Sequence, residues 1–172
     1  MTALINDLLR YSRLEQQALP ISQVDVRALI DQILTDRLSQ MKHPSPRINV
    51  DLPFAHVWGE PTSIQQVLIN LIDNALKFSR CANPPEIRIG GALRDHERVI
   101  WVRDNGIGFD SKDADRIFGL FERLHSQDEY EGTGVGLAIV KLVMEKHGGR
   151  TWAESCPGKG SAFYLAFPER PT

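Results

Sequence analysis

The stretch Pro61-Thr-Ser-Ile-Gln-Gln-Val-Leu-Ile-Asn-Leu-Ile-Asp-Asn-Ala-Leu-Lys-Phe-Ser79 carries the strongest helical pattern of the chain. Its apolar side chains recur at the 3.6-residue period and form one stripe: Ile64, Val67, Leu68, Leu71, Ile72, Ala75 and Phe78. Pro61 occupies the first helical position, where proline is favoured. The pattern predicts a helix with one buried face.

The segments on both sides of this helix predict a mixture of helices and strands. Further helices are expected over Ala3–Gln17, Val26–Met41 and Gly134–His147, with a short one near Asp113–Phe118. Strands are expected over Arg47–Leu52, Glu86–Leu93, Arg98–Arg103, Thr151–Ser155 and Ala162–Phe167, with a short extended piece at His56–Trp58. Because the order lacks regular βαβ alternation, we predict an α+β fold, a two-layer α/β sandwich with one mixed sheet and helices on one face.

The bulk composition is that of an ordinary soluble domain. The 172 residues are 42% hydrophobic and 24% charged, with a net charge of −2. This balance argues against nucleic-acid binding, which usually needs a basic stripe. The apolar runs are far shorter than the ~20 residues of a membrane span. Cys81 and Cys156 form no metal-ligand pattern, so we expect reduced thiols and a cytoplasmic location, a disulfide being the minor alternative.

The N-terminal helix has an unusually wide apolar face. Two interpretations are open: a core helix of the main domain, or part of a helical bundle whose other helices lie elsewhere. We favour the bundle, because Ala18–Ser22 resembles a short linker. Residues 1–18 are therefore assigned to a separate unit and residues 19–172 to the main domain.

Polar residues spaced by three and four line the other side of the helix that begins at Pro61. They are Asn70, Asp73, Asn74 and Lys77. One explanation is a solvated helix face. The other is a cation and phosphate site, since amide oxygens suit Mg²⁺ and a lysine one turn further along can reach a phosphate.

Asp104-Asn-Gly-Ile-Gly108 follows a predicted strand. Asp or Asn before Gly is a strong turn signal, so a simple tight turn is one explanation. The alternative is a base-recognition site, in which Asp104 accepts a hydrogen bond from the amino group of adenine. Gly106 and Gly108 would then allow the backbone to approach a flat ring.

Gly132-Thr-Gly-Val-Gly-Leu137 opens a predicted helix. Glycines before a helix N-terminus can hold phosphate, because free N–H groups and the positive helix end both attract anions. The spacing is neither the dinucleotide fingerprint nor a P-loop. The polar connection Phe109–Glu131 before it is too long for a simple turn, which indicates a functional or mobile segment.

Taken together and in this order, the segments resemble the nucleotide-binding boxes of the GHKL superfamily, which includes histidine kinases, DNA gyrase and the Hsp90 chaperones. Gln65–Ser79 resembles the asparagine box, Asp104–Gly108 the first glycine box, Phe118–Leu124 the phenylalanine box and Gly132–Leu137 the second glycine box. The glycines at 148–149 and 158–160 also match, so the resemblance covers nearly all of the chain after residue 20.

The resemblance implies a Bergerat-type sandwich that binds ATP and Mg²⁺. It makes Asn74 a Mg²⁺ ligand, with Asn70 contributing there or to the phosphates, and Lys77 and Arg123 phosphate contacts. Asp104 would read adenine beside Gly106 and Gly108. The phosphate segment would comprise Gly132, Thr133, Gly134, Val135, Gly136 and Leu137, under a lid formed by residues 109–131.

Two features favour the histidine kinase branch. ATP-hydrolysing relatives resemble one another in having a glutamate at the position of Asn70, and an asparagine cannot act as the base for water. Ala3–Arg13 resembles the end of the second helix of a kinase dimerisation hairpin, notably in phytochrome-like kinases. The family then implies a homodimeric full-length protein, a phosphoacceptor hairpin and a response regulator receiver domain as partners.

The chain departs from the kinase pattern in one respect. A histidine followed by an acidic residue on the first hairpin helix is absent: the histidines are His43, His56, His96, His125 and His147. For His147 we expect an electrostatic helix C-cap. The chain is therefore expected to bind ATP without phosphorylating itself efficiently. The alternatives are an anti-sigma-type serine kinase, a nucleotide-gated interaction domain and a GHKL ATPase.

Overall fold

The computed structural model describes residues 2–42 and 45–170, so that His43 and Pro44 lie outside it. Along the chain the elements are α1 (Thr2–Gln16), β1 (Ser22–Asp25), α2 (Val26–Gln40), β2 (Arg47–Asp51), β3 (His56–Gly59), α3 (Pro61–Ser79), β4 (Glu86–Arg94), β5 (Glu97–Asp104), the 3₁₀ turns η1 (Ser111–Asp113) and η2 (Arg116–Phe118), α4 (Gly136–Lys146), β6 (Arg150–Cys156) and β7 (Gly160–Pro168).

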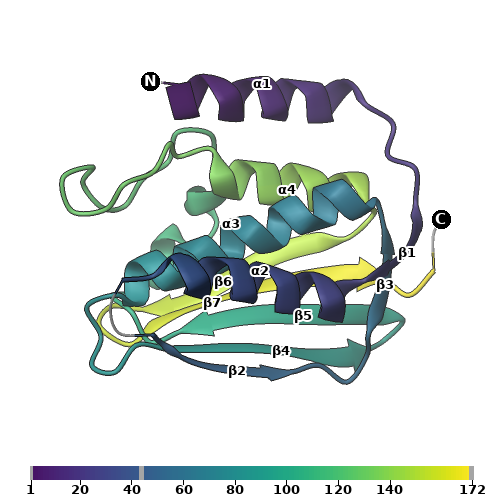
Figure 1. Ribbon diagram of the computed structural model, residues 1–172. Helices are drawn as coiled ribbons and strands as arrows, with labels where there is room; N and C mark the ends of the chain where they lie inside the picture. The colour runs from purple at the N-terminus through teal and green to yellow at the C-terminus, as the bar shows by residue number, and fades with distance from the viewer. Residues whose placement is uncertain (1, 43–44, 171–172) are drawn as a thin grey trace.

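A five-stranded mixed sheet in the order β2-β4-β5-β7-β6 forms one layer. β2 pairs parallel to β4, and the other neighbours are antiparallel. Helices α2, α3 and α4 cover one face of this sheet, and α1 lies above α4 on the side away from the strands (Figure 1). The predicted α+β sandwich with helices on one face is confirmed.

Helix α3 lies at the centre of the helical layer. The side chain of Glu60 caps its N-terminus by accepting hydrogen bonds from the N–H groups of Thr62 at 3.0 Å and Ser63 at 2.6 Å. The predicted stripe is buried against the sheet: Ile64, Val67, Leu68, Leu71, Ile72 and Ala75 are at most 2% exposed. This leaves the polar side of the helix free to form a site.

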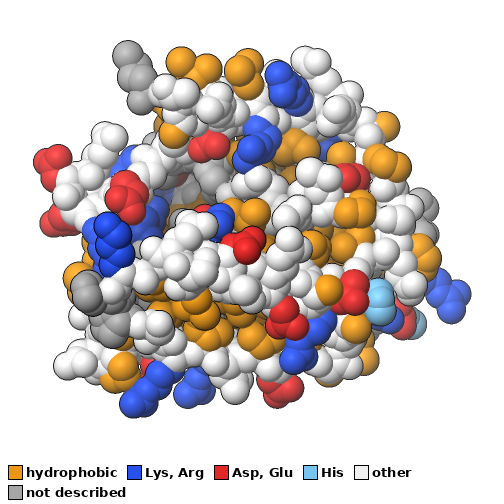
Figure 2. Space-filling view, viewed as in Figure 1, with side chains coloured by type: hydrophobic (Ala, Val, Ile, Leu, Met, Phe, Trp, Pro, Cys, Tyr) orange, Lys and Arg blue, Asp and Glu red, His pale blue; other side chains and the backbone are white. Residues whose placement is uncertain are grey.

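Helix α1 docks on the domain through one side. Leu14 is buried, and Leu4, Leu8 and Tyr11 pack against the core. Ile5 and Leu9, on the outer side, are 55% and 51% exposed, and hydrophobic side chains are visible along the top of the molecule in Figure 2. The apolar face that indicated a bundle is thus divided between an intramolecular contact and solvent. No helix of the described residues has the length and apolar character to span a membrane.

Some element assignments made from the sequence were wrong. Strand β1 was not predicted, and it pairs antiparallel with β3 as a separate two-stranded sheet. Helix α4 begins at Gly136 and not at Gly134, because Gly134 has a φ of +75°, outside the helical region. The single short helix expected before residue 118 is instead the two 3₁₀ turns η1 and η2.

His147 does not act as an electrostatic cap. Its ring is buried; its Nδ1 donates to the carbonyl of Val143 at 2.7 Å, and its Nε2 accepts from the N–H of Glu60 at 2.9 Å. These two bonds require a neutral ring, and burial lowers the pKa of His147 below its ordinary value. The residue therefore connects the end of α4 to the start of α3 by hydrogen bonds.

Candidate functional site

A cavity of about 270 Å³ opens at the polar side of α3, between the start of α4 and the connection that follows β5. Figure 2 shows the surface hollowed below α1, with Lys and Arg side chains at the edge of the hollow. Of the predicted site residues, the cavity is lined by Asn74, Lys77, Gly108, Arg123, Gly132, Thr133, Gly134, Gly136 and Leu137. The predicted residues Asn70, Asp104, Gly106 and Val135 lie beside or beneath it.

The polar row on α3 separates into residues that face the cavity and residues that do not. Asn74 and Lys77 face it. Asn70 is held to one side: its Oδ1 accepts from Gln66 Nε2 at 2.8 Å, and its Nδ2 donates to the carbonyl of Gly136 at 3.0 Å. Asp73 forms an ion pair with Arg37 of α2 at 2.6 Å and takes no part in the site.

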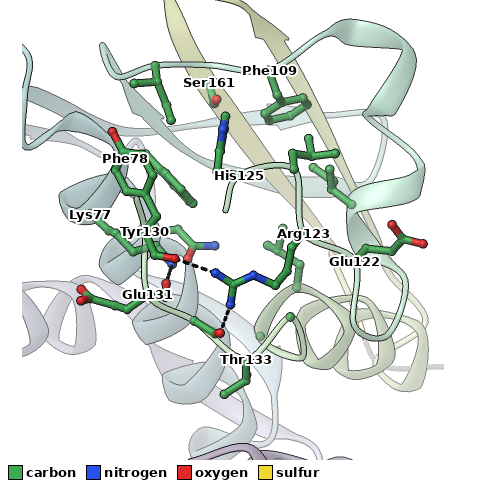
Figure 3. Close-up of a pocket in the computed structure, with 18 of the residues that line it drawn as sticks. Lys77, Phe78, Phe109, Glu122, Arg123, His125, Tyr130, Glu131, Thr133 and Ser161 are labelled. Atoms are coloured by element: carbon green, nitrogen blue, oxygen red, sulfur yellow. Dashed lines mark hydrogen bonds between the residues drawn. The ribbon is translucent and has the colours of Figure 1, made fainter. Parts of the chain in front are cut away.

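Two cations project into the cavity and are bound by backbone carbonyls of the segment 130–132 (Figure 3). Lys77 Nζ donates to the carbonyl of Glu131 at 2.7 Å. Arg123 donates to the carbonyls of Gly132 and Tyr130, the latter at 2.6 Å. Burial, with the nearby charge of Arg123, lowers the pKa of Lys77 from its ordinary value. An anion in the cavity would therefore favour the charged form of Lys77 and compete with these carbonyls for both cations.

Asp104 ends β5 and is buried, with 5% of the residue exposed. Its Oδ1 accepts from the N–H of Gly106 at 2.8 Å. Burial raises the pKa of Asp104 from 3.8 to about 6, although hydrogen bonds from the backbone of Gly106 and Ser161 oppose this shift. Its strand partner Ser161 lines the cavity, so the carboxylate lies next to the wall without forming part of it.

The two glycines after Asp104 have steric roles that the structure makes specific. A Cβ on Gly106 would lie 2.2 Å from the carbonyl oxygen of Phe78, so this glycine lets β5 end against the last turn of α3. Gly108 has a φ of +65°, and a Cβ there would lie 2.2 Å from the carbonyl oxygen of Cys156. At Gly106 the structure thus shows a close approach of two backbone segments, and its role beside a flat ring stays a prediction.

The second glycine segment wraps the other end of the cavity. Gly132 and Gly134 have positive φ values of 151° and 75°, which glycine adopts with little cost. Val135 is fully buried and anchors the segment in the core. The N-terminus of α4 then points at the cavity, and the first N–H groups of a helix have no intrahelical partner and favour anions.

Comparison with known proteins identifies the family to which this fold belongs. The family described as histidine kinase-, DNA gyrase B- and HSP90-like ATPase matches residues 59–171. The chain belongs to this family. It is 42% identical to cyanobacterial phytochrome A of Nostoc sp. (strain PCC 7120) and 39% identical to the phytochrome-like protein Cph1 of Synechocystis sp. (strain PCC 6803), each over 98% of this chain. It spans 22% of the length of each of these relatives.

A solved structure supports the same conclusion. The mycobacterial sensor histidine kinase MprB superposes with a TM-score of 0.73 at 25% identity, over 89% of this chain and 100% of that one. The predicted resemblance to the GHKL superfamily is therefore confirmed, with histidine kinase catalytic domains as structural neighbours.

Several residues of this GHKL site were not predicted as site residues. Phe78 was assigned to the buried stripe of α3, but it lines the cavity with His125 and Tyr130 of the connection 109–131. These three rings pack with centroids 5.1–5.7 Å apart, and Figure 3 shows the His125 ring inside the cavity below Ser161. Asp7 of α1 also lines it. The residues of the connection 109–131 lack any periodicity that would have signalled their position.

The residues that a Mg²⁺–nucleotide complex would contact suit a hard cation held mainly by its substrate. Asn74, whose side chain contains an amide oxygen, lines the cavity. The described residues contain no cluster of three or more His, Cys, Asp or Glu side chains that could hold a metal by themselves. Mg²⁺ is usually bound by one or two protein ligands together with phosphates and water, so this donor set fits.

Proposed function

We propose that this domain is the ATP-binding catalytic domain of a sensor histidine kinase, which transfers the γ-phosphoryl group of ATP to a histidine on a separate helical hairpin. The observation that carries the proposal is the convergence of Asn74, Lys77, Arg123 and the glycine segment 132–137 on one cavity next to Asp104. Family membership and the similarity to a sensor histidine kinase support it.

Each group has a role that follows from its chemistry. Asp104 accepts a hydrogen bond from the adenine amino group; guanine has a carbonyl at that position and would leave two acceptors facing each other. Lys77 and Arg123 exchange the carbonyls of residues 130–132 for phosphate oxygens. The N-terminus of α4 adds N–H donors. Bound Mg²⁺ would neutralise developing charge on the phosphates, with Asn74, and Asn70 after rearrangement, as its protein ligands.

Asn70 favours a kinase over an ATPase. Its amide cannot take a proton from water, and its two hydrogen bonds to Gln66 and Gly136 place it where it supports the start of α4. A histidine acceptor has a nitrogen lone pair and needs no such base, so positioning and charge stabilisation are sufficient for phosphoryl transfer.

The remaining features concern partners. We assign residues 1–18 to the second helix of the dimerisation hairpin, with residues 19–172 as the catalytic domain, in a cytoplasmic setting. The exposed Ile5 and Leu9 would pack on the first helix of the hairpin, in a homodimer that passes phosphate to a response regulator receiver domain.

The test has a binding arm and a transfer arm. Titration calorimetry with Mg-ATP and Mg-GTP is expected to show binding of ATP only, and loss of binding in Asp104→Ala. Transfer is measured with γ-labelled ATP and a supplied hairpin that carries the phosphoacceptor histidine. Phosphohistidine is expected on the hairpin and not on the 172-residue chain.

A matched pair of variants controls both arms. Asn74→Ala removes a residue of the cavity, whereas Asp73→Asn alters the neighbouring position, which is paired with Arg37. Loss of transfer in the first and not in the second supports the proposal. ATP binding without transfer to any hairpin would favour a nucleotide-gated interaction domain, and steady release of phosphate to water would favour an ATPase.

A further inference from the structure

Helix α1 reaches the nucleotide site at two points that the assigned roles do not explain. The hydroxyl of Thr133, in the second glycine segment, donates to Asp7 Oδ2 at 2.7 Å. One turn further along α1, Arg10 donates to Gln66 Oε1 at 2.6 Å, and the amide of Gln66 in turn holds Asn70 at 2.8 Å. The docked helix is thus bonded to both sides of the site.

Asp7 is more than a neighbour of the site, because its side chain lines the same cavity as Asn74, Lys77 and the glycine segment. These are the groups that would surround the phosphates. A carboxylate there repels the negatively charged phosphates of a nucleotide. It repels ATP more than ADP, because ATP has one more phosphate group. Asp7 also accepts the hydrogen bond of the Thr133 hydroxyl, so this hydroxyl can donate to a phosphate only after its bond to Asp7 breaks.

We propose that Asp7 is a further residue of the nucleotide site, one that selects against the triphosphate while α1 is docked on the domain. The inference rests on the proposed function, since it requires that ATP binds in this cavity. Helix α1 and the γ-phosphate then compete for the Thr133 segment. Because such coupling is reciprocal, ATP weakens the docking of α1 by the same factor by which docking weakens ATP.

This coupling gives a defined consequence for helix α1. Its apolar contact with the domain is made by Leu14 and part-buried neighbours, and Ile5 and Leu9 are already exposed. A small loss of interaction energy at Asp7 therefore shifts the population toward the released helix. Release would make the whole apolar face of α1 available to another helix at the moment when ATP is bound.

The experiment compares Asp7→Asn with Glu15→Gln, which removes the same charge from an exposed position on the same helix. Titration calorimetry measures the affinity of the 172-residue chain for Mg-ATP and Mg-ADP. Asp7→Asn is expected to tighten ATP binding about three- to tenfold at low salt, with a smaller effect on ADP. The gain should shrink at high ionic strength. Asp7→Glu keeps the negative charge and should behave like the wild type. Glu15→Gln should leave the ratio of the ATP and ADP affinities unchanged.

Hydrogen exchange supplies an independent readout. Saturating ATP is expected to speed amide exchange in residues 2–16 of the wild type, and ADP to do so less. Weaker ATP binding in Asp7→Asn would overturn the inference, because it would make the carboxylate a support for Mg²⁺ or for the glycine segment. Equal affinities in wild type and variant, with unchanged exchange in α1, would also overturn it. Absence of ATP binding in all variants would instead refute the proposed function itself.

Discussion

Replacing Asp104 by asparagine is expected to make the domain more stable relative to the wild type as pH rises from 5 to 7. It should also weaken the binding of ATP, because a neutral amide oxygen is a poorer acceptor than a carboxylate. Asp104 is 5% exposed as a residue, and burial raises its pKa from 3.8 to about 6. The folded state thus binds more protons than the unfolded state between these two pKa values. This group therefore stabilises the fold most below pH 3.8, and its contribution falls as pH rises through 6.

The magnitude follows from the size of the shift. The increase from 3.8 to about 6 is about 2 units, which at about 1.4 kcal/mol per unit amounts to about 3 kcal/mol over the whole titration. About 1 kcal/mol of this is lost between pH 5 and pH 7. Asparagine does not titrate, so the free energy of unfolding of Asp104→Asn minus that of the wild type should rise by this amount over the same interval.

The assay is urea unfolding of both proteins at half-unit steps from pH 5 to pH 7.5, with Mg-ATP binding measured at pH 7.5. His147 is present in both proteins, so any contribution from its titration cancels. A difference in stability that stays constant with pH, or that falls as pH rises, would refute the claim that burial of the Asp104 charge is costly. Retained selective binding of ATP in Asp104→Ala, which has no acceptor at this position, would refute the role of Asp104 in reading adenine.

Three further predictions concern the site and its support. Asn74→Ala is expected to weaken Mg-ATP binding at least tenfold by calorimetry, about 1.4 kcal/mol, while Asp73→Asn leaves it unchanged. His147→Gln should lower the free energy of unfolding by about 1–3 kcal/mol at pH 7.5. The lowered pKa of His147 means that the wild type loses this advantage as pH falls below 6.5, so urea titration at pH 5.5 should show a smaller difference. Gly106→Ala places a Cβ 2.2 Å from the Phe78 carbonyl and should cost about 1–3 kcal/mol, measured by the same titration.

Local sequence patterns predicted the elements in which buried apolar residues recur at a regular spacing. The stripe of α3 is the clearest case, and its residues from Ile64 to Ala75 are buried as expected. The polar turn at Asp95 and His96 also forms, with positive φ values at both residues, as in a tight two-residue hairpin. These features depend on neighbours within a few residues, so the sequence carries their signal directly.

Features that depend on distant partners were missed. Strand β1 has four residues, of which Val24 alone is buried, and its extended form depends on pairing with β3 more than thirty residues away. Asn70 and Asn74 have the same chemistry and the same helical spacing, yet contact with Gly136 and Gln66 holds the first outside the cavity. The sequence could indicate both asparagines but could not distinguish them, because the distinguishing contact comes from α4.

Asp104 and Lys77 are two groups at the cavity whose charged forms are disfavoured by burial, and they indicate where a ligand binds. Burial raises the pKa of Asp104 and lowers the pKa of Lys77, so folding costs free energy at both residues. An adenine amino group beside the first and a phosphate beside the second would each favour the charged form and recover part of that cost. His147 is also buried with a lowered pKa, but it does not line the cavity, and both of its ring nitrogens have partners within the fold. Asp104 and Lys77 have hydrogen-bond partners within the fold as well, but Lys77 lines the cavity and Asp104 lies next to its wall. A perturbed pKa at a cavity indicates a site more strongly than one away from it.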